Sequence, residues 1–277
     1  MQTRYLERAG GRLAYDEVGD GPLVVCAPSL GDLRGEYRFL APQLAAEGYR
    51  VVSFDLRGMG DSSARWDDYS AGATGADMLA LVRALGGKPA YLIGTSISGS
   101  AAIWAAAEAP ELVAGIIMIG AGVDGNPASR RSAQLTYGPL LARPWGAAIW
   151  LWYYSTLYPA ARPDDWTEYT ARLRGNLRER GRLAAMRQQI YALSDGASQM
   201  APRLARVTAP ALVIMGSKDR DFKDPAYEAQ HAAERLHGTA RLIEGAGHYP
   251  HAEVPAQTGP IIVEFLQRAR EGVAHGA

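Results

Sequence analysis

The turn at residues 94–99 constrains the fold of this chain more than any other segment. An apolar run, Ala90–Ile93, leads into the sequence GTSISG and then directly into an alanine-rich helical stretch. A strand that passes into a helix through the pattern small-x-Ser-x-small is typical of a nucleophile elbow, whose turn holds the serine in a strained conformation. Small residues are needed there because larger side chains would clash with the neighbouring strand and helix. The pattern predicts that Ser96 is a nucleophile at the edge of an α/β sheet.

Short β-type runs alternate with helical stretches along most of the chain. This alternation indicates an α/β fold, with a mostly parallel sheet covered by helices on both faces. The predicted strands are Leu23–Ala27, Val51–Asp55, Ala90–Ile93, Gly115–Ile119, Ala211–Met215 and Ala240–Glu244. The predicted helices are Tyr37–Glu47, Ala71–Leu85, Gly99–Ala109, Ala226–Leu236 and Ile261–Arg270. Glycine turns within the first twenty residues predict an antiparallel hairpin at the edge of the sheet.

One long segment breaks the alternation. Residues 123–206 contain no convincing strand, and they hold four of the six tryptophans of the chain. We expect this segment to form a helical cap subdomain, inserted into a core domain made of residues 1–122 and 207–277. The insertion follows a predicted strand on the side where catalytic loops leave such a sheet. Some of its aromatic side chains are therefore expected to line an apolar substrate pocket, although the pattern does not assign any one of them.

A serine hydroxyl becomes a useful nucleophile when a base takes its proton and an acid orients that base. His248 lies in the glycine-containing loop GAGHYP after the last predicted strand, which makes it the preferred base. His251 is the fallback, although packing or hydrogen bonding within the loop is its expected role. The other three histidines, His231, His237 and His275, are expected at the surface.

The acid is expected on a loop that follows an earlier strand. Asp219 comes shortly after the predicted strand Ala211–Met215 and is the first choice. Asp221 is close by, and Asp224 stands where it could cap the next helix. Asp124, which follows the strand before the cap, is an alternative acid.

Two backbone N–H groups are needed to stabilise the oxyanion that forms during acyl transfer. Ile97 follows the predicted nucleophile directly and begins the helix, so its N–H is one expected donor. The second is expected from Ser29, in the loop after the predicted strand Leu23–Ala27.

Composition excludes several other functions. Lysine plus arginine and aspartate plus glutamate both number 29, so no nucleic-acid partner is expected. The glycine runs form no dinucleotide fingerprint and no Cys/His cluster is visible, so neither a cofactor nor a metal is expected. The single cysteine, Cys26, lies in an apolar strand and is expected in the core. The N-terminus lacks the apolar run of a signal peptide and no segment is long enough to cross a membrane. We therefore expect a cytoplasmic monomer or homodimer that binds a small-molecule substrate and has no membrane partner.

Taken together, these motifs resemble those of the α/β-hydrolase superfamily, in the branch that carries a helical cap. The resemblance covers nearly the whole chain. It includes the elbow at Ser96 and the sequence DLRGMGDS at residues 55–62, which resembles the Asp-x-Arg-Gly-x-Gly-x-Ser loop of this branch. It implies the α/β-hydrolase fold, with Ser96 as nucleophile, His248 as base and Asp219 as acid. Ser29 and Ile97 would be the oxyanion donors.

The chain departs from the family pattern at two places. The family usually has His-Gly before the oxyanion residue, where this chain has Ala27 and Pro28. The missing histidine normally braces the loop, and proline has no N–H. Ser98 stands where glycine is usual in the elbow. An altered oxyanion hole or pocket is therefore expected. A serine nucleophile also argues against haloalkane dehalogenases and epoxide hydrolases, which use aspartate in this fold.

The sequence predicts a serine hydrolase that cleaves a carboxylic ester or lactone of a small apolar substrate through an acyl-enzyme. A first alternative keeps the same residues but changes the reaction, to that of an acyltransferase, carbon–carbon hydrolase, lyase or cyclase. A second alternative is a receptor-like protein that binds a ligand with little turnover. The altered loop at Ala27 and Pro28 favours this last possibility, and the set Ser96, Asp219 and His248 opposes it.

Overall fold

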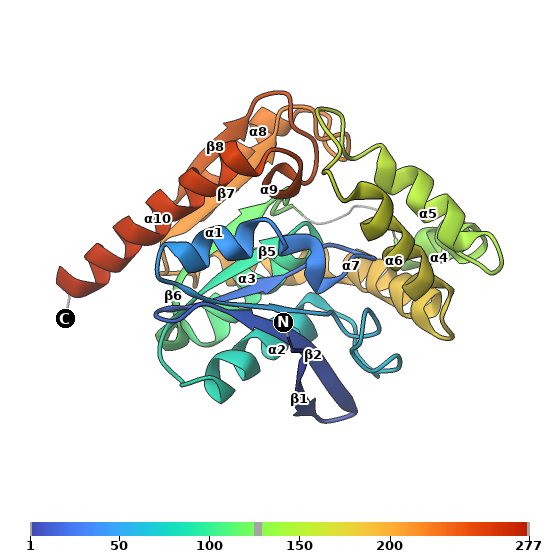
Figure 1. Ribbon diagram of the computed structural model, residues 1–277, viewed down its shortest axis with the longest axis horizontal. Helices are drawn as coiled ribbons and strands as arrows, with labels where there is room; N and C mark the ends of the chain where they lie inside the picture. The colour runs from blue at the N-terminus through green and yellow to red at the C-terminus, as the bar shows by residue number, and fades with distance from the viewer. Residues whose placement is uncertain (1, 125–128, 276–277) are drawn as a thin grey trace.

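Eight strands form one sheet in the computed structural model, which describes residues 2–124 and 129–275 (Figure 1). The strands are β1 (Arg4–Arg8), β2 (Gly11–Val18), β3 (Leu23–Ala27), β4 (Arg50–Phe54), β5 (Ala90–Thr95), β6 (Val113–Ile119), β7 (Ala211–Gly216) and β8 (Thr239–Ile243). Their order across the sheet is β1-β2-β4-β3-β5-β6-β7-β8. β2 pairs antiparallel with β1 and β4, and the remaining pairs are parallel. The N-terminal hairpin therefore lies at the sheet edge, as predicted.

Helices cover both faces of this sheet. The helical segments are η1 (Arg34–Tyr37), α1 (Leu40–Ala46), α2 (Ala71–Ala84), α3 (Ile97–Glu108), η2 (Pro110–Leu112), α4 (Arg130–Leu140), α5 (Gly146–Ser155), α6 (Trp166–Arg178), α7 (Arg182–Leu204), α8 (Pro225–Arg235), α9 (Pro250–Glu253) and α10 (Pro255–His275). α2, α3 and α8 contribute to one core cluster, while α1 and α10 pack into the other. The strands between the clusters read as nearly continuous apolar runs because both of their faces are buried.

The strand β3 shows this two-sided burial clearly. Val25 packs into the cluster with α2 and α3, whereas Val24 and Cys26 pack into the cluster with α1 and α10. All three are fully buried. Burial raises the pKa of the Cys26 thiol well above its usual range, which keeps the thiol protonated. The position of Cys26 in the core agrees with the sequence prediction.

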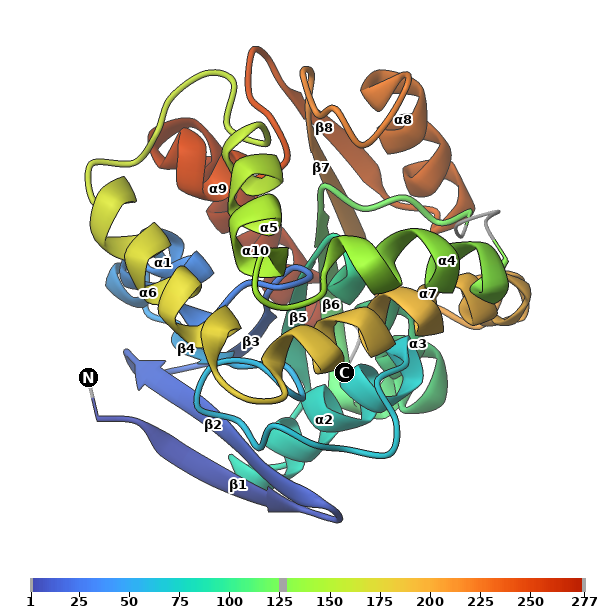
Figure 2. The same cartoon turned by 90° about the vertical axis from the view of Figure 1, so that its right-hand side faces the viewer.

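The described residues between β6 and β7 form four helices, α4 to α7. Figure 2 shows all four on the side of the molecule that faces the viewer. α4 and α7 pack together, α6 contacts both α5 and α7, and α7 also contacts α3 of the core. We call α4 to α7 the cap helices. Their bounds fall within the segment 123–206 that was predicted to form the cap.

A buried carboxylate joins these helices to the core. Asp32, in the loop after β3, accepts hydrogen bonds from the hydroxyl of Tyr154 in α5 at 2.9 Å and of Tyr169 in α6 at 2.5 Å. Burial and the nearby Glu36 carboxylate raise the pKa of Asp32 to about 7, although the two tyrosine hydroxyls lower it. The three residues come from a loop of the core and from two different helices, so this contact ties α5 and α6 to the loop after β3.

Candidate active site

Ser96 lies at the sharp turn between β5 and α3. Its backbone has φ 54° and ψ −117°, a strained combination for a residue with a side chain. The Ser96 N–H donates to the carbonyl of Ile119 in β6 at 2.8 Å, which helps to hold this conformation. A Cβ atom at Gly94 would lie 2.1 Å from the Ser98 carbonyl oxygen, so a larger residue cannot stand there. The local geometry is that of the elbow predicted from the sequence.

The predicted base and the preferred acid are hydrogen-bonded to each other. His248 Nδ1 lies 2.7 Å from Asp219 Oδ2, and both side chains are buried. The other carboxylate oxygen of Asp219 accepts the N–H of Asp221 at 3.0 Å. Asp219 therefore has a fixed orientation, and the ring nitrogen His248 Nε2 is left as the one available for proton transfer.

The surroundings of His248 favour its protonated form. Burial alone lowers the pKa of the imidazole, but the Asp219 carboxylate opposes this by its charge and its hydrogen bond. The charges of Asp221 and Glu36 add to the effect of Asp219, and the pKa of His248 is raised to about 9. An imidazolium formed at this position is therefore stabilised, which a base needs after it has accepted a proton.

The alternative acids have other positions. Asp221 Oδ2 is 3.7 Å from His248 Nδ1, and the Tyr153 hydroxyl donates to the same carboxylate. Asp124 lies 2.9 Å from His231 instead, between the core helix α8 and the start of the cap.

The remaining candidates have structural positions. Asp224 accepts the N–H of Tyr227 at 3.0 Å and so caps α8, as its place in the sequence indicated. His251 is buried, stacks on Tyr37, and lies 3.1 Å from Glu36. His231 is half-buried and His237 is exposed.

A glutamate that the sequence analysis did not single out braces the His248 loop. Glu253 ends the short helix α9, and its carboxylate accepts the N–H of Gly247 at 2.6 Å and of Ala161 at 3.2 Å. The backbone N–H of His248 donates to the backbone carbonyl of Leu157 at 3.0 Å. The loop is thus tied to the segment after α5. A helix of one turn carries little periodicity, so no sequence pattern predicts the position of Glu253.

The predicted oxyanion donors differ in their availability. Ile97 is the first residue of α3, where the leading N–H groups of a helix have no partner within the helix. The N–H of Ser29, by contrast, donates to Glu36 Oε2 at 2.7 Å. Glu36 is buried, and its other carboxylate oxygen faces His251. The N–H of Ser29, predicted as the second oxyanion donor, is therefore already hydrogen-bonded to a carboxylate in this structure.

The two departures from the family pattern contact each other. The Ser98 hydroxyl donates to the carbonyl of Pro28 at 2.6 Å, and the Tyr37 hydroxyl donates to the carbonyl of Ala27 at 2.8 Å. Both contacts are buried. The loop after β3, which lacks the usual bracing histidine, is therefore held by a serine of the elbow and a tyrosine of η1.

A cavity of about 460 Å³ opens beside Ser96 and His248. It lies between the core and the cap, and it is lined by Ser29, Leu30, Ser96, Ile97, Tyr137, Leu140, Leu141, Ile149, Trp150, Trp152, Tyr153, Leu157, Ile190, Leu193, Asp221, His248 and Tyr249. Most of these side chains are apolar or aromatic, as expected for a substrate pocket. The structure therefore identifies the cap aromatics at the cavity as Tyr137, Trp150, Trp152 and Tyr153.

Among the described residues, one set of three side chains has its ligand atoms close enough together to bind a metal ion. Ligand atoms of Asp219, Asp221 and His248 lie within 4.8 Å of one another. The hydrogen bond between His248 Nδ1 and Asp219 Oδ2 explains why these two side chains lie so close together, without a metal ion between them.

A strained serine between a strand and a helix, beside a hydrogen-bonded His–Asp pair and under a helical cap, defines the class of α/β hydrolases. The sequence profile of the alpha/beta hydrolase family matches residues 24–259. The chain belongs to this family.

Individual members are similar over almost their full length. A 2-hydroxy-6-oxononadienedioate/2-hydroxy-6-oxononatrienedioate hydrolase from Paraburkholderia xenovorans is 26% identical, over 92% of this chain and 90% of that protein. A thermophilic esterase from Thermogutta terrifontis has a TM-score of 0.78 at 19% identity, covering 97% of this chain and 99% of its own. The enol-lactonase from Burkholderia xenovorans LB400 has a TM-score of 0.77 at 22% identity, covering 95% of this chain and 100% of its own. The two structures support the fold.

Proposed function

We propose that the protein is a serine hydrolase that cleaves a carboxylic ester or lactone of a small apolar substrate. One observation carries the proposal. Ser96 and His248 line the same apolar cavity, and His248 is hydrogen-bonded through Nδ1 to the buried Asp219. A nucleophile, a base and an acid that orients the base are the groups that acyl transfer from a serine requires.

In the proposed reaction, Ser96 Oγ attacks the carbonyl carbon while His248 Nε2 takes the hydroxyl proton. Asp219 holds the imidazole in one tautomer and stabilises its positive charge. The C–O bond of the ester then breaks, the leaving alcohol takes the proton from His248, and the acyl group stays on Ser96. A water molecule, deprotonated by His248, then attacks the acyl carbon, the bond from that carbon to Ser96 Oγ breaks, and His248 returns the proton to Ser96 Oγ as the acid is released.

The N–H of Ile97 is the first proposed oxyanion donor, because it begins α3 beside Ser96. Ser29 remains the proposed second donor, although its hydrogen already donates to Glu36. A developing oxyanion and the Glu36 carboxylate would compete for this hydrogen. The competition makes the second donor weaker than a free N–H, and it favours activated esters and strained lactones as substrates.

The cavity also supports an uncharged acyl group. Among the described residues that line it, none is a lysine or arginine, and Asp221 is the one that carries a formal charge besides the imidazole. A substrate that carries a carboxylate in addition to its ester bond would therefore find no lysine or arginine partner there. The esterase and enol-lactonase with similar structures act on the bond class proposed here, as their names state.

Turnover of a substrate panel tests the proposal. Esters of graded acyl length and a set of lactones would be incubated with the protein, with and without an added alcohol, and the products identified. We expect free acid or opened lactone as the main product. Product that appears only when the alcohol is present would instead indicate an acyltransferase. Ligand binding by folded protein without turnover would indicate the receptor-like alternative.

The pH dependence of activity follows from the raised pKa of His248. The base must be neutral to accept a proton, and the imidazole is protonated below its pKa of about 9. We expect kcat/KM to rise roughly tenfold per pH unit from pH 6 and to level off near pH 9. Initial rates on a soluble ester between pH 5 and pH 10 measure this. A profile that is flat between pH 6 and pH 9 would contradict the assigned base.

A further inference from the structure

More than half of the large apolar side chains that are well exposed lie in one short segment of the described chain. Of the seven that are well exposed among the described residues, four lie between residues 135 and 152. They are Leu135 at 71%, Leu140 at 41%, Trp145 at 51% and Trp152 at 67% exposure. We call these four residues the cap rim. Exposed tryptophans are costly in water, so a cluster of this kind marks a contact surface.

The cap rim adjoins the entrance to the cavity beside Ser96. Leu140 and Trp152 line that cavity and are also exposed, so they form part of its mouth. Trp145 Nε1 donates to the carbonyl of Pro139 at 2.9 Å, which holds the indole beside the end of α4. Figure 2 shows α4 and α5 together on the side that faces the viewer.

The charge around the cap rim has one sign over a long segment. Residues 129–163 contain no aspartate or glutamate, and their charged side chains are Arg130, Arg131, Arg143 and Arg162. Arg131, Arg143 and Arg162 are exposed. Arg131 precedes Leu135 by four residues, so the two lie on the same side of α4. The chain as a whole has no net charge.

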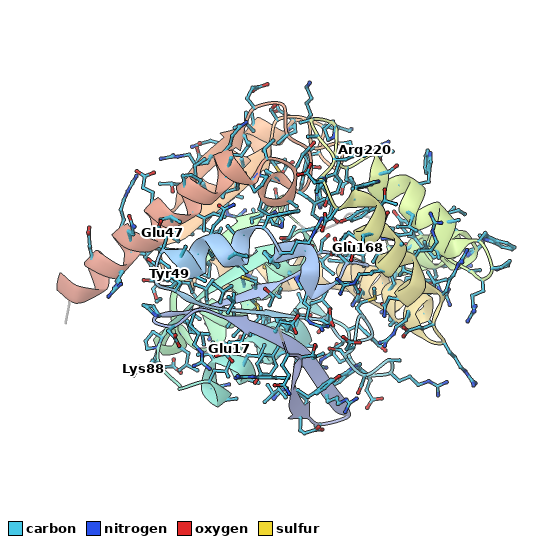
Figure 3. All side chains as sticks on the ribbon, in the orientation of Figure 1. Glu17, Glu47, Tyr49, Lys88, Glu168 and Arg220 are labelled. Atoms are coloured by element: carbon cyan, nitrogen blue, oxygen red, sulfur yellow. The ribbon has the colours of Figure 1, made fainter. Side chains whose placement is uncertain are left out.

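Other charged groups are found near the mouth. The guanidinium of Arg220 lies over the ring of Tyr153, 5.6 Å from its centroid. Figure 3 shows Arg220 at the end of the molecule that carries α5. The carboxylate of Asp221 is also at the mouth, where it accepts the hydroxyl of Tyr153. Residues 129–163, which contain the cap rim, therefore carry positive charges only, and Asp221 adds one negative charge at the mouth.

We propose that the cap rim docks on an anionic lipid bilayer, and that the enzyme cleaves esters dissolved in that bilayer. The proposal rests on the serine hydrolase function proposed above. Tryptophan and leucine side chains enter the boundary between headgroups and acyl chains, and arginine is attracted to anionic headgroups. No helix in the described part of the chain is long and apolar enough to cross a membrane. The expectation of no membrane partner rested on the lack of a spanning segment and of a signal-peptide run in the sequence, and neither point addresses docking at a surface.

A lipid surface fits the position of the rim better than a protein partner does. The rim includes the mouth of the cavity, so a second protein chain seated on it would cover the route to Ser96. A bilayer pressed against the same residues would present apolar substrate directly to the cavity. This arrangement agrees with the apolar lining and with the lack of a cationic partner for a charged substrate among the described lining residues.

Sedimentation with vesicles tests the proposal on the full chain carrying Ser96→Ala, which leaves the lipid intact. We expect binding to vesicles of phosphatidylcholine with a quarter phosphatidylglycerol, and at least tenfold weaker binding to pure phosphatidylcholine. Arg131→Gln combined with Arg143→Gln should weaken binding to the anionic vesicles about 25-fold, at about fivefold per arginine. Leu135→Ser combined with Trp145→Ser should also abolish most binding.

Matched controls use exposed residues that lie outside the cap rim and outside the cap helices. Arg83→Gln combined with Lys88→Gln removes the same two positive charges, and Figure 3 shows Lys88 at the opposite end of the molecule from α5. Tyr227→Ser removes an exposed aromatic side chain of α8. Neither control should weaken vesicle binding more than twofold. All variants should retain the circular dichroism of the unaltered protein.

The outcomes separate docking from catalysis. Turnover of a soluble short-chain ester without vesicle binding would overturn the docking proposal and leave the hydrolase function standing. Equal loss of binding in the control with Arg83→Gln and Lys88→Gln would also overturn it, as would a dimer that buries Trp145 in sedimentation velocity and fluorescence measurements. Vesicle binding by folded protein that cleaves no ester would support docking while contradicting the proposed function.

Discussion

Ser96→Ala is expected to lower kcat for ester hydrolysis by about 10⁵-fold to 10⁶-fold while the protein stays folded. The hydroxyl is the one group in the proposed reaction that forms a bond to the substrate, so nothing replaces it. Alanine fits the turn at least as well as serine, because the strained backbone at φ 54° is held by neighbours on β5, β6 and α3. The measurement is kcat on a soluble ester, together with a thermal unfolding curve that checks the fold.

Covalent labelling gives an independent readout for the same residue. A fluorophosphonate should add one adduct to the unaltered protein, seen by intact-protein mass, and none to the Ser96→Ala protein. Ser98→Gly is the matched control in the same turn, because it keeps Ser96 and restores the residue usual at that position. It should still be labelled, more slowly, because the hydrogen bond from Ser98 to the Pro28 carbonyl is lost. An adduct that persists in Ser96→Ala would show that another residue is the nucleophile.

The central sheet could be predicted closely from the sequence because its strands are buried on both faces. β3 has the predicted bounds Leu23–Ala27, β4 differs from prediction by one residue at each end, and β7 extends one residue beyond its predicted end. Continuous apolar runs between turn residues leave few alternatives in an α/β fold. α10 is longer than predicted, because it begins at Pro255 and continues through Pro260. Pro255 at the first helical position costs no hydrogen bond, whereas Pro260 lies inside the helix and removes the bond that its N–H would have donated to the carbonyl of Ala256.

The pairing of the site residues was partly predictable. Ser96, Asp219 and His248 each follow a strand, and parallel strands bring such loops to one edge of the sheet. The same rule does not identify Glu36. Its partners are the N–H of Ser29, seven residues away, and His251, which is 215 residues away. A contact across such a separation has no periodic signature. The hydrogen bond from the Ser29 N–H to Glu36 therefore could not be predicted from the sequence.

The cap illustrates a second limit of the sequence. Its composition indicated helices and an aromatic pocket, and the structure has helices there. Trp150 and Trp152 are two residues apart on α5, yet Trp150 is buried and Trp152 is exposed at the mouth. Which tryptophan faces water depends on how α5 packs against α6 and the core. That packing is set by tertiary contacts such as those of Tyr154 with Asp32, which a single sequence does not reveal.

Asp219→Asn is expected to lower kcat by about 10⁴-fold, the loss associated with replacing the acid of a Ser-His-Asp site by its amide. An asparagine can turn its amide group toward His248 Nδ1, which favours the wrong tautomer and leaves no proton acceptor at Nε2. The pKa of His248 should also fall, because the Asp219 carboxylate is the main group that raises it against the effect of burial. The residual activity should therefore depend less on pH between pH 6 and pH 9.

Asp221→Asn is the comparison that tests this assignment. Its carboxylate is 3.7 Å from His248 Nδ1 and its side chain is 31% exposed, whereas Asp219 is 2.7 Å away and buried. Solvent screens the more exposed charge, so we expect less than a tenfold loss of kcat and a small downward shift of the pH midpoint. Rates for both variants on one soluble ester give the result. If Asp221→Asn were the more damaging substitution, Asp221 would be the acid, and Asp219 would serve to hold the Asp221 backbone through the hydrogen bond that its carboxylate accepts.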